Sequence, residues 1–246
     1  MAKLDFIDWP STILLAAPSL KLFEDVRTKY ANKYPHIAFG WWPTIPSSYW
    51  VSGLANTSDL ERLFAELTSK VHEKKLSVLI DLEFPIKKHL YIKNIFRIRA
   101  NKKRILEFFT DAPRFNLRAY TAEYPAPNAL IYTLYQLLGI SPSFKFQHTK
   151  LPMCYSSIGL RYFGEKIWNS VKSFEKKFAQ ANSDRVGFGL GATAIGMSGN
   201  GQIITPKQLA EDIDWANGCG VKEIFIFRLG GLNESYVSVL KEFAAP

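Results

Sequence analysis

The chain alternates seven times between a short apolar run and a turn rich in Pro, Gly or Ser. Each run has the β-branched and aromatic content of a strand. The apolar runs lie at residues 11–17, 36–42, 76–85, 115–124, 144–155, 185–192 and 221–228. Helical patterns follow over residues 20–33, 60–74, 129–138, 159–181, about 205–218 and 234–243, and a basic helix precedes the fourth run. Strands that alternate with helices predict βαβ units and a parallel sheet.

Seven such units in 246 residues predict an α/β fold of the TIM type, a closed (β/α) barrel, because such barrels use about 250 residues. The first run is not followed by G-x-G-x-x-G, which disfavours a nucleotide-binding Rossmann fold. One of the eight expected strands is missing, shortened or hidden in the N-terminal residues or in the 86–98 loop. No segment resembles a linker, so we predict a single barrel domain over residues 1–246.

Two carboxylates end the third apolar run. Asp81 and Glu83 are two positions apart, so in a strand they point to the same face, and Pro85 ends the strand just beyond them. Adjacent carboxylates cannot both ionise cheaply, so one pKa rises and that group can act as a general acid near neutral pH. The alternative is a structural pair bonded to Lys or Arg within the barrel.

TIM barrels build their active sites at the carboxyl ends of the strands. Besides the acidic pair, the side chains expected at those ends are Trp41, Trp42, Glu123, Tyr124, Met153, Tyr155 and Arg228. Aromatic planes beside carboxylates suit a sugar, whose apolar face stacks on a ring while acids bond its hydroxyl groups. Trp41 and Trp42 alternate, so only one of them can face this edge while the other packs outward. The remaining residues have structural alternatives, as core fillers or as ion-pair partners.

The order of these features resembles the family-18 glycoside hydrolases, the chitinase-like barrels. Their signature strand ends in D-x-x-D-x-D-x-E, and Asp81-Leu82-Glu83 matches its last three positions, with Leu76 and Leu79 at the two earlier aspartates. Met153-Cys154-Tyr155 resembles the M-x-Y that the family places two strands later. The resemblance extends over about residues 76–232.

The resemblance implies substrate-assisted, retaining hydrolysis of a glycan that contains N-acetylamino sugars. Glu83 would protonate the glycosidic oxygen, Asp81 would orient the substrate's acetamide group, and Tyr155 would bond its carbonyl. Two other hypotheses remain open. One is a non-catalytic carbohydrate-binding barrel. The other is a different barrel enzyme that acts on phosphorylated sugars, with glycines near 196–201 and 230–231 at the phosphate and Lys150 as the candidate Schiff-base lysine.

The net charge of +9, from 31 Lys and Arg against 22 Asp and Glu, raises the question of a polyanionic partner. The basic side chains lie mostly in helical segments mixed with acids, and even the densest region, residues 87–104, fits a solvated loop and helix face better than a nucleic-acid site. We therefore expect a carbohydrate ligand and no specific nucleic acid, and the sequence leaves the oligomeric state open.

Cysteine and histidine usage predicts neither a disulfide framework nor a metal site. Cys154 and Cys219 are far apart and fit reduced thiols, and the four histidines are scattered outside any ligand spacing, so we expect no cofactor. No apolar run reaches the roughly 20 residues that a membrane span needs. The N-terminus is a poor signal peptide, which favours a cytoplasmic protein unless a leader has been trimmed.

Overall fold

The computed structural model describes residues 2–46, 49–69, 71–73, 75–84, 95–195 and 202–244. The chain forms two compact units. One unit consists of residues 10–124 and 132–149, and the other of residues 1–9, 125–131 and 150–246. The arrangement as a single domain stays a prediction.

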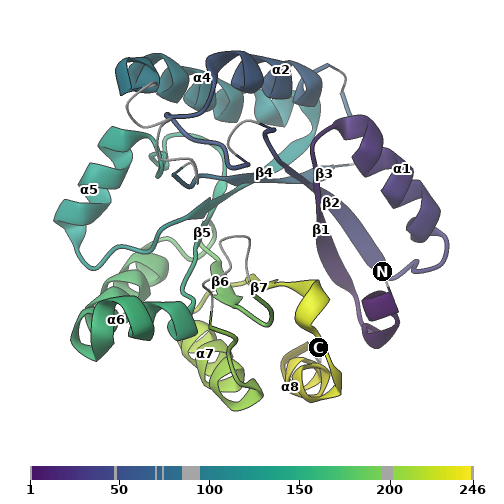
Figure 1. Cartoon of the computed structure of the whole chain (residues 1–246), viewed down its shortest axis with the longest axis vertical. Helices are drawn as coiled ribbons and strands as arrows, with labels where there is room; N and C mark the ends of the chain where they lie inside the picture. Colours follow the sequence, from purple (N-terminus) through teal and green to yellow (C-terminus); the bar gives the residue numbers. More distant parts are fainter. Residues whose placement is uncertain are drawn as a thin grey trace. The chain divides into compact units, whose positions relative to one another are not determined.

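The first unit contains four parallel strands that lie side by side in chain order (Figure 1). They are β1 (Ser11–Ala17), β2 (Ile37–Pro43), β3 (Leu76–Asp81) and β4 (Leu117–Glu123). Its helices are α1 (Leu20–Ala31), α2 (Thr57–Leu67) and α4 (Ile98–Asp111), with short 3-10 turns η2 (Ile95–Arg97) and η3 (Ala112–Phe115) beside α4. The first four predicted strands are therefore present.

The two faces of β2 have different roles. Trp41 is fully buried and its ring stacks on Phe23 of α1, with ring centroids 6.1 Å apart, so this face belongs to the core between sheet and helices. Burial of each such side chain contributes roughly 1.5–3 kcal/mol. Gly40 is the residue before Trp41. Any other residue there would place its Cβ within 2.7 Å of the Ser77 carbonyl oxygen, so only glycine allows β2 and β3 to approach this closely.

The second unit contains the later strands, β5 (Thr149–Pro152), β6 (Phe188–Gly191) and β7 (Ile224–Phe227). Strands β6 and β7 pair in parallel from Phe188 and Ile224 onward, and bridges from Lys150 and Met153 join the β5 region to the β6 region, also in parallel. The helices are α6 (Ser156–Ala181), α7 (Pro206–Gly218) and α8 (Glu234–Ala244), with 3-10 turns η1 (Ala2–Phe6) and η4 (Leu229–Gly231). Helix α5 (Ala129–Leu138) contributes residues to both units.

Local signals explain where several helices begin. Thr205 caps α7 by accepting a hydrogen bond from the Gln208 amide, and Pro206 occupies the first helical position, as predicted. Helix α6 begins earlier than predicted, at Ser156, and is kinked at Gly164, which has a φ of 73° that favours glycine.

The fifth predicted strand is much shorter than expected. Residues 144–155 were expected to form one strand, but only Thr149–Pro152 does. Just before it the backbone turns, with Phe146 bonded to the Ser143 carbonyl and His148 to the Phe146 carbonyl. Residues 143–148 therefore form a turn, which hydrophobic periodicity alone does not distinguish from a strand.

Seven strands occur among the described residues, one in each predicted apolar run. The 86–94 part of the loop that was considered for an eighth strand lies outside them. Within the described part of the chain, no helix is both long and apolar enough to cross a membrane.

Candidate functional site

A cluster of polar side chains lies at the carboxyl ends of β3 and β4. Asp81 is the last residue of β3 and is 3% exposed, and Glu83 follows two residues later, half-buried. The Tyr124 hydroxyl, one residue beyond β4, donates a hydrogen bond to Glu83 Oε2 at 3.2 Å. The two strand ends stay in register because the Leu82 amide bonds to the Ala122 carbonyl at 2.9 Å.

The two carboxyl groups share one buried environment, and both hold their proton more tightly than usual. Burial raises the pKa of Asp81 well above its ordinary value, and the charge of Glu83 raises it further. Burial also raises the pKa of Glu83, to about 7, against the opposing effect of its hydrogen bonds with Tyr124 and Asp81. Because that value lies near neutral pH, Glu83 can both accept and donate a proton.

Tyr124 serves this pair as a hydrogen-bond donor and not as a base. Burial, together with the charge of Glu83, raises the pKa of Tyr124 above its ordinary value of 10.0, so the hydroxyl keeps its proton. A donor held against Glu83 can stabilise negative charge that develops beside it.

Three aromatic side chains lie next to the acidic cluster, and we call Trp42, Tyr49 and Trp50 the aromatic arm. Trp42, on β2, lies beside Asp81 and partly offsets the rise in the pKa of that carboxyl group. Tyr49 packs edge-on against Trp42 with ring centroids 6.2 Å apart, and Trp50 packs against Tyr49 at 5.8 Å. All three rings are half-buried, so each keeps some surface for a ligand.

The chain after β2 holds the aromatic arm in place. Ile45 and Tyr49 exchange two backbone hydrogen bonds, at 2.9 and 2.6 Å, and the Val51 amide donates to the Asp81 carbonyl at 2.9 Å. Tyr49 has a φ of 68°, a left-handed conformation that costs about 1–2 kcal/mol in a residue other than glycine. The sequence analysis missed Tyr49 and Trp50, although the density of aromatic residues after Trp41 was a signal for them.

Two predicted site residues in the same unit lie away from the acidic cluster. Trp41 packs toward α1, as described, and its indole N–H donates to the Ala17 carbonyl at 2.9 Å. Glu123 is buried and accepts hydrogen bonds from Thr121 and Ser141, each at 2.5 Å. Since neighbouring residues of a strand point to opposite faces, Glu123 and Tyr124 diverge.

The other predicted site residues belong to the second unit. The Tyr155 ring stacks on the Phe227 ring, with centroids 5.9 Å apart. The guanidinium group of the exposed Arg228 lies 5.9 Å from the centre of the Phe227 ring. Met153 bridges to Gly189, so Met153, Tyr155 and Arg228 follow or end neighbouring strands. That these three residues belong to a functional site stays a prediction, as does the membership of the predicted residues of the first unit.

The sequence analysis also considered metal ligands, a reactive lysine and the two cysteines, which lie beyond the acidic cluster. Among the described residues, no group of three or more His, Cys, Asp or Glu side chains has an arrangement that could hold a metal ion. Lys150 is fully buried in β5, and Cys154 and Cys219 are buried free thiols. Pro85, the lysines of 87–93 and the glycines near 196–201 lie outside the described residues.

Comparison with known proteins shows the fold. No protein-family model matches the chain, and no curated protein matches its sequence. A solved D-tagatose 3-epimerase-like protein is similar in structure, with a TM-score of 0.55 and 9% identity over 99% of this chain and 90% of that one. D-allulose 3-epimerase from Methylomonas sp. has a TM-score of 0.50 and 10% identity, over 92% of this chain and 74% of that one. The chain is accordingly an α/β protein with the TIM-type (β/α) barrel fold, as predicted.

The resemblance to family-18 glycoside hydrolases is wrong, and with it the prediction of a glycoside hydrolase. The two similar solved structures are of 3-epimerase types and not chitinase-like barrels. The physical reason is that acidic and aromatic residues collect at the carboxyl ends of strands in every enzyme of this fold, so two short motifs with the right strand spacing do not distinguish one family from another.

Proposed function

We propose that this protein binds a sugar and moves a proton at the carbon next to the sugar's carbonyl group, as a sugar epimerase or isomerase does. The observation that supports this most is the buried Asp81–Glu83 pair, in which Glu83 has a pKa of about 7. A base for this reaction works best when its pKa lies near the working pH. The names of the two similar barrels, both 3-epimerase types, point to the same reaction class.

The proposed chemistry uses groups already in contact. The Glu83 carboxylate accepts the proton from the C–H bond. The electron pair of that bond forms a carbon–carbon double bond, and the π pair of the carbonyl group moves onto its oxygen to give an enediolate. Tyr124, or Asp81 in its protonated form, donates a hydrogen bond to that oxygen. Delivery of a proton from solvent or a second acid to the opposite face of the same carbon gives the epimer. Return of the proton from Glu83 to the neighbouring carbon gives the isomer.

The aromatic arm supports a sugar as the ligand. A pyranose or an extended sugar has a C–H face that stacks on the rings of Trp42 and Trp50, while its hydroxyl groups donate hydrogen bonds to the carboxylates. The same arm also favours a second candidate function, a non-catalytic carbohydrate-binding barrel. The two differ in whether Glu83 is needed for turnover or only lies beside the bound sugar.

Hydrogen exchange with solvent tests the proposal. The protein is incubated in D2O with aldoses, ketoses and their phosphates, with and without added divalent cations, and loss of the C–H signal next to the carbonyl is followed by proton NMR. We expect exchange for at least one sugar, reduced at least about 100-fold in Glu83→Gln. Glu107→Gln, which changes an exposed glutamate on α4, is the matched control and should exchange like the wild type.

The outcome separates the candidates. Exchange that is equal in wild type and Glu83→Gln would remove Glu83 as the base. Sugar binding without exchange in any condition would instead support the carbohydrate-binding barrel. Exchange that occurs only with phosphorylated sugars would indicate that the substrate is a sugar phosphate.

A further inference from the structure

Residues 51–55, which precede α2, are buried although they have no regular secondary structure. Val51, Ser52 and Ala55 are fully buried, and Leu54 is 7% exposed. A buried loop must satisfy its backbone N–H and C=O groups inside the protein, because no water reaches them. Here the Ala55 amide bonds to the Ser52 carbonyl, which leaves the carbonyl groups of Gly53 and Ala55 to be satisfied from outside the segment.

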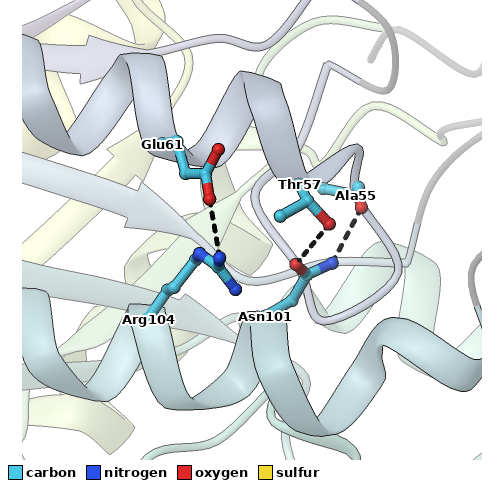
Figure 2. Close-up of polar contacts among 5 residues, drawn as sticks. All are labelled: Ala55, Thr57, Glu61, Asn101 and Arg104. Atoms are coloured by element: carbon cyan, nitrogen blue, oxygen red, sulfur yellow. Dashed lines mark hydrogen bonds and ion pairs between the residues drawn. The ribbon is translucent and has the colours of Figure 1, made fainter.

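Asn101 of α4 supplies those partners. Its side chain is fully buried, and its amide nitrogen donates to both the Gly53 and the Ala55 carbonyl oxygens at 2.9 Å. Its amide oxygen accepts from the Thr57 hydroxyl, also at 2.9 Å. Figure 2 shows the contacts with Ala55 and Thr57, which converge on one side chain. Because both N–H groups and the oxygen are engaged, only one orientation of the amide fits.

The same segment is attached to the candidate site. Val51 donates its amide hydrogen to the carbonyl of Asp81, and Trp50 of the aromatic arm is the residue immediately before Val51. Close packing leaves the segment little freedom, since a Cβ on Gly53 would lie 3.1 Å from the Leu138 carbonyl oxygen. The three hydrogen bonds of Asn101 therefore fix a segment that contacts both the acidic pair and the aromatic arm.

We propose that Asn101 is a positioning residue for the sugar site: it holds residues 51–57 so that Trp50 stays packed in the aromatic arm and the backbone of Asp81 stays in place. This assignment rests on the proposed function for its effect on turnover. The effect of Asn101 on the site itself does not rest on the proposed function, because the pKa of Glu83 can be measured without any substrate.

The structure offers a matched control one helical turn away. Arg104 and Glu61 form a second link between α4 and α2, at 2.6 Å, and Figure 2 shows it beside the Asn101 contacts. This ion pair is partly exposed, with 34% and 53% of the two side chains accessible, and it joins α4 directly to α2. Arg104→Gln thus loosens the same pair of helices without releasing the segment.

The experiment compares Asn101→Ala with Arg104→Gln. Carbon-13 NMR of labelled glutamate carboxyl groups follows the titration of Glu83, which is identified by its absence in Glu83→Gln. In Asn101→Ala we expect the pKa of Glu83 to fall by about one unit as water enters. If a sugar is turned over, KM should rise at least about tenfold with a smaller change in kcat, since the aromatic arm binds and does not react. Arg104→Gln should match the wild type in all three quantities.

Each outcome has a consequence. A folded Asn101→Ala with wild-type Glu83 titration and KM overturns the proposal, and so does an equal loss in Arg104→Gln, which would indicate general helix packing. If Asn101→Ala does not fold, Thr57→Val takes its place, since it removes only the hydroxyl group that donates to Asn101. A lower pKa of Glu83 and a higher KM in Thr57→Val would support the proposal. An unchanged pKa of Glu83 and an unchanged KM would overturn it. A shifted Glu83 titration in a protein that turns over no sugar supports the positioning role and counts against the proposed reaction.

Discussion

The raised pKa of Glu83 predicts that Glu83→Gln makes the folded protein more stable at alkaline pH. A carboxyl group with a pKa of 4.5 in the unfolded chain and about 7 in the fold keeps its proton in the folded state at pH values where the unfolded state has lost it. Its contribution to the free energy of unfolding is therefore full below pH 4.5, falls as pH rises toward 7, and is absent above 7. Glutamine has no proton to lose, so the variant should lack this decline.

The magnitude follows from the size of the shift. A change from 4.5 to about 7, at about 1.4 kcal/mol per unit, corresponds to about 3.5 kcal/mol. Partial exposure of Glu83 to water reduces this to about 2 kcal/mol. The side-chain amide introduced by Glu83→Gln can still accept the Tyr124 hydrogen bond, so little stabilisation is lost in exchange. Loss of the Glu83 charge also lowers the pKa of Asp81, which changes stability in the same direction.

Urea denaturation followed by tryptophan fluorescence at pH 4.5 and pH 8 measures the effect. We expect the free energy of unfolding of Glu83→Gln to exceed that of the wild type by about 2 kcal/mol more at pH 8 than at pH 4.5. Glu107→Gln, at an exposed position, should follow the wild type at both values. If wild type and Glu83→Gln show the same pH dependence, the environment inferred for the acidic pair is wrong, and the proposed reaction loses its main support.

Three further predictions concern other parts of the chain. Trp50→Ala should weaken sugar binding at least about tenfold by calorimetry, because it removes a stacking surface, whereas Tyr30→Ala, which truncates a half-buried aromatic on α1, should leave affinity unchanged. Gly40→Ala should lower the free energy of unfolding by about 1–3 kcal/mol, since its Cβ meets backbone, while Gly218→Ala, with open space around it, should cost less. Asp212→Ala should destabilise by about 3–5 kcal/mol, because it leaves the Lys172 ammonium without its buried partner, and a denaturation midpoint equal to that of the wild type would contradict this.

The order of strands and helices and the class of fold can be predicted from the amino-acid sequence alone. Periodicity is a local property, so each of the seven apolar runs contains a strand among the described residues, and their alternation with helices indicates the barrel class. The spacing of Asp81 and Glu83 likewise predicts that they share a face, since the side-chain period of a strand is two. Where local and tertiary forces compete, as in residues 144–148, the pattern predicts a strand and the structure has a turn.

Which side chains join the acidic pair depends on tertiary packing. The sequence does not distinguish Trp41 from Trp42. The packing of α1 against β2 takes Trp41 into the core, while Trp42 lies beside Asp81. Tyr49 and Trp50 join the site through loop conformation, and Asn101 holds the segment that follows them through hydrogen bonds between residues more than 40 positions apart. No local pattern encodes either. Short motifs suggested the wrong family for the same reason: they record residue types at strand ends, whereas the site depends on what the rest of the chain packs around them.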